Sequence, residues 1–161
     1  DRFSAASAAL ARAEALDPSL AVVRAARADH MVRSGRLDEA EAFARDATAE
    51  NPAYARALVQ LAEIAARKGE IAEADQQLDA ADRLDPEEPR TALARTAIAL
   101  NRFSADAAIA GATETLQRFQ ARGGVYTNLS ENRAAGSLVS QAFRFLELEG
   151  WGRYYADRVF D

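Results

Sequence analysis

Three prolines recur at a constant interval in this chain. Pro18, Pro52 and Pro86 follow one another at intervals of thirty-four positions, and each comes directly after an aspartate or an asparagine. Gly35 and Gly69 are separated by the same interval, and each lies seventeen positions before a proline, at the midpoint of the period. A fixed period of this length indicates a repeated unit that buries its apolar faces only against its neighbours. The sequence therefore predicts a stack of repeated units.

The segments between these glycines and prolines have the pattern of helices. Residues 37–50 (LDEAEAFARDATAE) and 71–84 (IAEADQQLDAADRL) carry small or apolar residues at three- and four-residue intervals, which is the spacing of one helix face. Glycine commonly ends a helix, and proline cannot continue one. Each unit is therefore predicted to contain a helix, a tight turn, a second helix and a corner, in an all-α fold.

These residues resemble the tetratricopeptide repeat (TPR). That family has about 34 residues per unit, small residues at its eighth, twentieth and twenty-seventh positions, and proline at its thirty-second. Counting from Ala21, the matching residues of the first complete unit are Ala28, Ala40, Ala47 and Pro52. Counting from Ala55, the matching residues of the second are Ala62, Ala74, Ala81 and Pro86. The resemblance implies a right-handed α-solenoid of antiparallel helix pairs.

The resemblance covers about residues 1–122. It implies a partial unit at 1–20, complete units at 21–54 and 55–88, and a degenerate unit at 89–122. The partial unit looks like the second helix of a truncated repeat.

The two ends of this region depart from a complete unit in different ways. The partial unit has the pattern of a second helix alone, in which Ala6, Ala13 and Pro18 match. In the degenerate unit, Phe103 replaces the turn glycine and Gln120 replaces the proline.

Two arginines occupy places where the family usually has large apolar residues. These are Arg24 and Arg27, and the equivalent residues one unit later are Leu58 and Leu61. We expect the arginine stems to lie along the helix interface, with the guanidinium groups reaching Glu14 or other acids of the first helix. The alternative is that a missing preceding unit shapes this joint.

In the family, the first helix of each unit lines a concave groove. The candidates that match the groove-facing positions here are Asp29, Arg33, Arg56, Val59, Gln60, Glu63, Arg67, Arg90, Leu93 and Asn101. The resemblance implies a peptide or protein partner, with arginines for its acidic groups and with Val59 and Leu93 for its apolar groups. The alternative is that Asp29–Arg33 and Glu63–Arg67 are only solvated i,i+4 pairs, each contributing about 0.3–0.5 kcal/mol.

Large side chains gather at the end of the chain, within residues 123–161, where we expect a connector and C-terminal capping helices. Trp151 is the only tryptophan. Trp151, Tyr154, Tyr155 and Arg158 have the spacing of one helix face. This face is interpreted either as an end plug that packs back on the preceding helix or as a second interface with a partner.

The composition excludes several classes of site. The net charge is −5, which does not suggest the positive surface that nucleic-acid binding requires. The chain has no cysteine, and His30 is its only histidine, so thiolate, zinc and Ser-His-Asp sites are not expected. No apolar run approaches the roughly 20 residues of a membrane span. We therefore expect no enzyme activity, no cofactor or metal, no nucleic-acid partner and no direct membrane insertion.

The function that this pattern favours is a protein–protein interaction scaffold. The alternative is a structural or regulatory arm of a longer protein whose other part, an enzyme domain or an outer-membrane barrel, carries the activity. The chain begins at Asp1 without methionine, which suggests an excised piece. Its bias toward arginine and alanine points to a bacterial source. The compartment, cytoplasm or periplasm, and the oligomeric state stay open.

Overall fold

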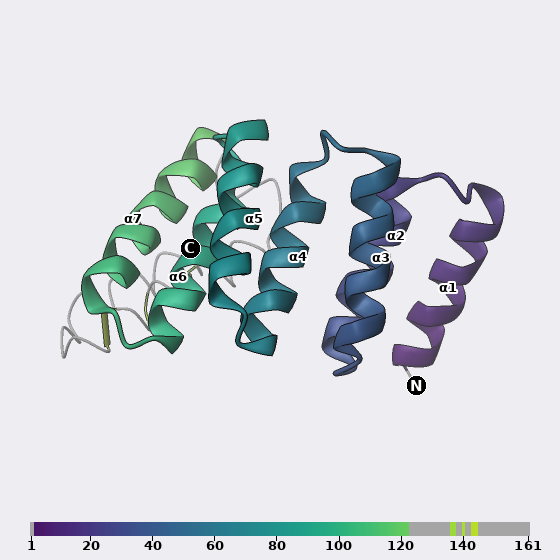
Figure 1. Ribbon diagram of the computed structural model, residues 1–161, viewed down its shortest axis with the longest axis horizontal. Coiled ribbons are helices and arrows are strands. Elements are labelled where there is room, and N and C mark those ends of the chain that lie inside the picture. Colours follow the sequence, from purple (N-terminus) through teal and green to yellow (C-terminus); the bar gives the residue numbers. More distant parts are fainter. Residues whose placement is uncertain (1, 123–135, 138–139, 141–142, 145–161) are drawn as a thin grey trace. The chain divides into compact units, whose positions relative to one another are not determined.

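The computed structural model describes residues 2–122, 136–137, 140 and 143–144. Every bounded element within this part of the chain is a helix (Figure 1), and these are α1 (Arg2–Leu16), α2 (Ala21–Arg33), α3 (Leu37–Glu50), α4 (Ala55–Lys68), α5 (Ile71–Leu84), α6 (Pro89–Asn101) and α7 (Ala105–Ala121). The chain divides into two compact units, Asp1–Pro86 and Glu87–Asp161. The predicted all-α class and its helix pairs are confirmed.

The first unit holds α1 to α5 side by side, and successive helices run in opposite directions (Figure 1). α2 packs on α3, and α4 packs on α5, so each complete repeat forms one helix pair. α3 also contacts α4, and α2 contacts α4 directly. The first helices of two successive pairs are therefore neighbours, as a shared binding surface requires.

The turn inside each pair depends on a left-handed residue. Gly35 has φ +75° and Gly69 has φ +85°, a conformation that other residues adopt at a cost. In the degenerate pair Phe103 occupies this place with φ +55°. The tight turn is thus kept even where the glycine is lost.

The corners between pairs are formed by side chains that accept hydrogen bonds from the backbone. The Asp17 carboxylate accepts from the N–H of Ser19 at 3.0 Å, and the Asn51 side chain accepts from the N–H of Ala53 at 3.1 Å. Such turns, combined with proline, end one helix and direct the chain into the next. The periodic proline signal in the sequence is therefore a signal for these corners.

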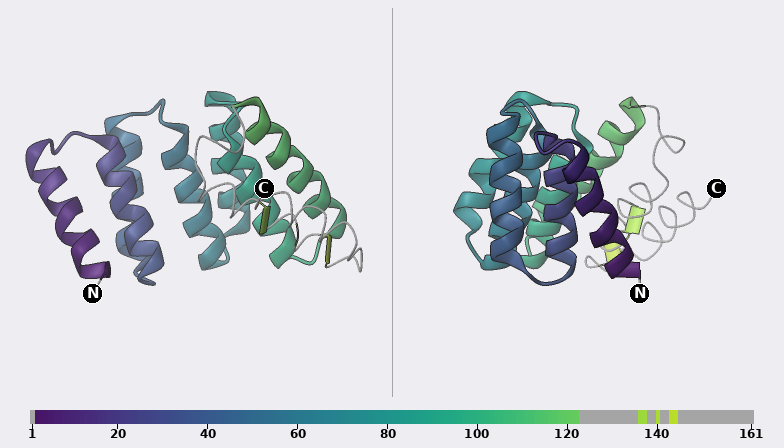
Figure 2. Two further views of the ribbon diagram at one scale, coloured as in Figure 1. Left: turned by 180° about the vertical axis from the view of Figure 1, so that it is seen from behind. Right: turned by 90° about the vertical axis from the view of Figure 1, so that its right-hand side faces the viewer.

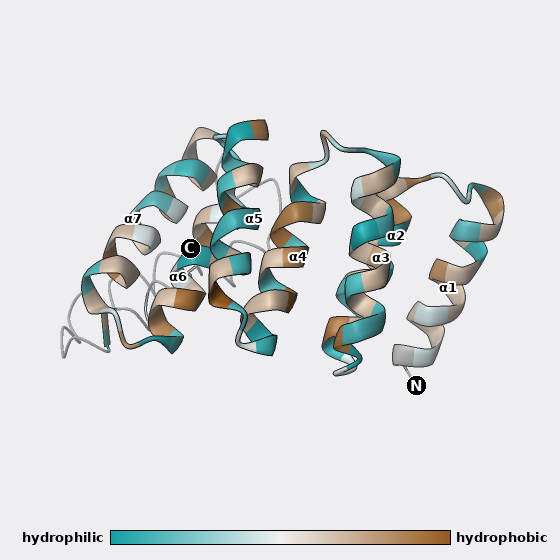
Figure 3. Ribbon diagram, in the orientation of Figure 1, coloured by the Kyte–Doolittle hydropathy of each residue, from teal (hydrophilic) through white to brown (hydrophobic). Residues whose placement is uncertain are grey.

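The core of the first unit is built mainly from alanine. The small residues of the two complete repeats are all fully buried, at 0% exposure: Ala28, Ala40, Ala47, Ala62, Ala74 and Ala81. Larger buried side chains such as Ile64 and Leu78 come from α4 and α5. The ribbon of α4 accordingly carries much hydrophobic colour in Figure 3. Close helix contacts through alanine allow the helices to pack with few large side chains.

The second unit contains the α6–α7 pair. Pro89 is the first residue of α6, and the Glu88 side chain accepts a hydrogen bond from the N–H of Arg90 at 3.1 Å. This arrangement combines a proline and an acidic cap at a helix start. A small apolar cluster forms between α6 and α7, and Phe143 packs against it.

Most of the C-terminal region lies outside the described residues. This includes the predicted connector and the face made by Trp151, Tyr154, Tyr155 and Arg158, so both interpretations of that face stay predictions. None of the helices in the described part is long and apolar enough to cross a membrane.

Candidate functional site

A polar cluster joins α2 to α4. The side-chain Nε2 of Gln60 donates hydrogen bonds to the carbonyl oxygen of Ala25 at 2.8 Å and to Asp29 Oδ1 at 2.7 Å. Arg56 Nη2 lies 3.7 Å from Asp29 Oδ2. Gln60 is only 2% exposed, so its amide contacts the Asp29 carboxylate from the side of the protein interior. The carboxylate and the guanidinium are consequently fixed next to each other at the surface.

Around this cluster, charged side chains continue along the same sides of α2 and α4. Asp29 and Arg33 are one helical turn apart on α2, and Glu63 and Arg67 have the same spacing on α4. Arg33 and Arg67 are exposed, while Glu63 is half-buried. We call Asp29, Arg33, Arg56, Glu63 and Arg67 the α2–α4 face. This face carries three arginines against two acids, although the whole chain has an excess of acids.

Not every predicted residue reaches this surface. Val59 is fully buried, at 0% exposure, and Gln60 is nearly so. α4 contacts α2, α3 and α5, which leaves little of its circumference open. In this structure Val59 belongs to the core and not to a surface, and Gln60 positions Asp29.

The predicted residues of the second unit lie on α6. Arg90 and Leu93 are half-buried, and Asn101 is exposed at the end of the helix. These three residues belong to the second unit, and their contribution to a groove stays a prediction.

The contacts of Asp29 also bear on the alternative of a simple i,i+4 pair. Its carboxylate is directed to Gln60 and Arg56, which both lie on α4 in the next repeat. The sequence pattern suggested a local partner, Arg33, because neighbours on one helix can be read directly. A contact between two helices depends on their relative placement, which a single helix pattern does not contain.

The two arginines in apolar positions divide their contacts between neighbouring helices. Arg27 pairs with Glu14 of α1, as the sequence suggested. Arg24 turns the other way, with Nη1 at 3.0 Å from Asp46 and Nη2 at 3.5 Å from Glu50, both on α3. The prediction that Arg24 reaches an acid of the first helix is therefore wrong.

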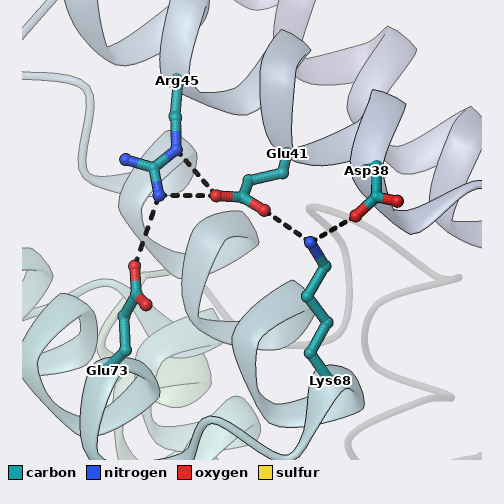
Figure 4. A network of polar contacts seen from close by, with 5 residues as sticks. All are labelled: Asp38, Glu41, Arg45, Lys68 and Glu73. Atoms are coloured by element: carbon teal, nitrogen blue, oxygen red, sulfur yellow. Dashed lines mark hydrogen bonds and ion pairs between the residues drawn. The ribbon is translucent and has the colours of Figure 1, made fainter.

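A second polar network, which the sequence reasoning missed, joins α3, α4 and α5 (Figure 4). Lys68 Nζ lies 2.6 Å from Asp38 Oδ1 and 2.7 Å from Glu41 Oε2. Arg45 holds the other oxygen of Glu41 at 2.5 Å and reaches Glu73 at 3.5 Å. The only sequence signal was that Lys68 is the single lysine. The network therefore bridges three helices of the stack that carries the α2–α4 face.

The titration of this network follows from its contacts. Hydrogen bonds from Lys68 and then from Arg45 lower the pKa of Glu41. Hydrogen bonds to Asp38 and Glu41 raise the pKa of Lys68. Both shifts favour the charged forms of Glu41 and Lys68 at neutral pH.

The described residues offer no set of ligands for a metal. Among them, no group of three or more histidine, aspartate or glutamate side chains could hold a metal ion. The arrangement that the α2–α4 face does offer is fixed charge at a surface, which suits recognition of a charged partner.

The comparisons with known proteins agree with this architecture. The family model described as the tetratricopeptide repeat matches residues 31–98. The crystal structure of MamA is similar over 98% of this chain and 86% of that chain, with a TM-score of 0.61 and 14% identity. The crystal structure of YrrB, a TPR protein with an unusual peptide-binding site, is similar over 95% of this chain and 91% of that chain, with a TM-score of 0.56 and 15% identity. At these identities the likeness shows the fold alone. Among curated proteins, none matches the chain by sequence.

Proposed function

Because this chain is a member of the tetratricopeptide repeat family, we propose that it is a protein-interaction scaffold and that it binds an acidic peptide segment on the α2–α4 face. The observation that carries the proposal is the cluster of Arg56, Asp29 and Gln60, in which a buried amide orients a surface charge pair between two successive repeats.

The placement of the arginines favours an acidic segment. Arg33 and Arg67 occupy equivalent places of successive repeats, in the last turns of α2 and α4. Both are exposed, and a guanidinium offers a planar set of donors that matches a carboxylate. An extended chain that crosses both helices would present one acid to each arginine.

The pair of Asp29 and Arg56 adds a specificity element. Asp29 repels an acid that approaches α2 at the wrong place, and Arg56 attracts one that approaches α4. Recognition through fixed charges of both signs selects register as well as charge. The peptide-binding site of YrrB supports a peptide as the class of partner, and the proposal gives the chain no catalytic step.

The test is a titration of the full chain against fluorescent acidic peptides and against the same peptides with glutamine in place of each glutamate. We expect measurable affinity for the acidic series only, and a decrease in affinity as salt rises, since exposed charges are screened. The double variant R33A/R67A should weaken binding by about tenfold, at roughly 0.7 kcal/mol per exposed pair lost.

The matched control is Arg83→Ala, which removes an exposed arginine from α5, outside the α2–α4 face. It should leave the affinity unchanged. R83A removes one positive charge and R33A/R67A removes two, so a loss of binding free energy in R83A of about half that in R33A/R67A would show that only net charge matters. Equal binding of the glutamine series would exclude an acidic partner.

A further inference from the structure

Asp29 is bound unequally by its two partners on α4. Its Oδ1 atom accepts a hydrogen bond from Gln60 Nε2 at 2.7 Å. Its Oδ2 atom lies 3.7 Å from Arg56 Nη2, which is close enough for charge attraction but longer than a hydrogen bond. The carboxylate is therefore anchored by the amide of Gln60, and the guanidinium of Arg56 is only drawn toward it.

The burial of these side chains follows the same order. Gln60 is 2% exposed, whereas the side chains of Asp29 and Arg56 are 28% and 36% exposed. Gln60 Nε2 also donates to the carbonyl oxygen of Ala25 at 2.8 Å, so two acceptors on α2 fix its amide. An ion pair that is about a third exposed contributes little to stability. Exchanging Asp29 for another carboxylate therefore costs Arg56 little.

Asp29 has an arginine of the α2–α4 face as a neighbour on each of the two helices. Arg33 follows it by one turn of α2, and residues at this spacing have Cβ atoms about 5–6 Å apart. Arg56 reaches it from α4, which contacts α2 directly. Figure 2 (left) shows the helices of the first unit standing side by side. An acid bound to Arg33 would therefore come close to a carboxylate of the same sign.

The contact between Asp29 and Arg56 is the kind of contact that the proposed partner would make. Arg33 and Arg67 are exposed, and their guanidinium groups suit the acids of a bound segment. Arg56 belongs to the same face but already has a carboxylate of the chain beside it. Of the three arginines on this face, one is therefore supplied with an acid from within.

We infer that Asp29 is an internal competitor of the acidic segment, which occupies Arg56 and repels acids near Arg33. The inference rests on the function proposed for the α2–α4 face and defines its partner more closely. A third acid on the segment exchanges one ion pair at Arg56 for another, so it adds little affinity. The face therefore selects a segment by two acids, one for Arg33 and one for Arg67, and gives no advantage to a more densely acidic chain.

The first test is Asp29→Asn, titrated as the full chain with the fluorescent acidic peptides. Asparagine keeps an oxygen that accepts from Gln60 but has no charge, so the melting temperature should stay close to that of the wild type. We expect the affinity to rise by about two- to fivefold, the range for one exposed ion pair. The matched control is Glu70→Gln, which removes an exposed acid at the start of α5, outside the α2–α4 face. It should change the affinity far less.

The second test varies the peptide and needs no substitution in the chain. A peptide with two glutamates is compared with a series in which a third glutamate replaces one neutral residue at a time. In the wild-type chain no member of the series should gain more than about 1.5-fold, because an ion pair is lost for the one gained. In D29N the best member should gain about two- to fivefold, and its affinity should fall more steeply with salt. Arg56→Gln in the D29N chain should remove that gain.

Equal gains in D29N and E70Q would reduce the effect to net charge and would overturn the inference. A third glutamate that strengthens binding as much in the wild type as in D29N would also overturn it. The same titrations separate the inference from the proposed function. If R33A/R67A weakens binding while D29N leaves it unchanged, only the inference fails. If neither the wild type nor D29N binds the acidic series, both fail.

Discussion

α2 and α4 are equivalent helices of successive repeats, but they are held by different chemistry. α4 places Leu58 and Leu61 in the interface, where they are 9% and 8% exposed. α2 has Arg24 and Arg27 at the same places, and these arginines form ion pairs with α3 and α1. Ala21 and Ala28 of α2 have alanine equivalents in α4, Ala55 and Ala62, whereas the large side chains at the helix contacts differ.

This difference separates two requirements of the repeat. The alanines set how closely helices approach, so Ala28 and Ala62 are both fully buried. The positions with large side chains need only a group that covers the contact between neighbouring helices, and an arginine stem can do so as well as a leucine. Arg27 also lies over the ring of Phe43, 4.5 Å from its centroid. The helix contact made by Leu61 (the apolar joint) and the equivalent contact made by Arg27 (the polar joint) should therefore respond differently to truncation and to salt.

The largest effect is expected at the apolar joint. Leu61→Ala removes a buried side chain and should lower the free energy of unfolding by about 2–4 kcal/mol, by loss of transfer free energy and formation of a cavity. Chemical denaturation would measure this loss, which should be the same at low salt and in about 1 M sodium chloride. A loss that disappears in salt would contradict an apolar joint.

The third pair extends the comparison, because Thr96 stands where α2 and α4 have alanine. The added bulk is matched by Gly111 of α7, where a Cβ atom would lie 2.5 Å from Thr96 Oγ1. Gly111→Ala should therefore lower the free energy of unfolding by about 1–3 kcal/mol through overpacking. The double variant T96A/G111A should recover most of that stability in thermal melts. No recovery would mean that the two positions are independent.

A smaller effect is expected at the polar joint. Arg27→Ala should lower the free energy of unfolding by about 1 kcal/mol, since the ion pair with Glu14 is partly exposed and the stem contributes some packing. High salt should narrow the difference from wild type, in contrast to Leu61→Ala at the equivalent place. Equal salt response in the two variants would remove the distinction between the joints.

Much of this architecture could be predicted from sequence, because it depends on local and periodic signals. The alanine frame, the prolines and the turn glycines all recur with the same period, so their spacing alone indicates paired helices. The candidate site was harder to predict. Position within a repeat identified Asp29 and Arg56, but not that Val59 is fully buried or that Arg24 turns to α3. The burial of a side chain and its choice of partner depend on which helices pack against each other. They also depend on rotamers that several neighbouring residues set together.

The smallest effect concerns the network around Lys68 and Glu41. The pKa of Glu41 is lowered from 4.5 in the folded chain, so its contribution to stability is present above about pH 4.5 and is lost as the pH falls through the lowered pKa. Glu41→Gln should therefore make the melting temperature less dependent on pH below 4.5. A variant with the same acid dependence as wild type would show that Glu41 does not contribute.

The most direct test of the proposed function is to locate a bound acidic peptide. A photoreactive acidic peptide can be crosslinked to the full chain, and the modified residues can be mapped by mass spectrometry. We predict crosslinks within residues 29–33 of α2 and 56–67 of α4, which disappear with excess unlabelled acidic peptide. Competed crosslinks on α3 or α5, with none on α2 or α4, would contradict it.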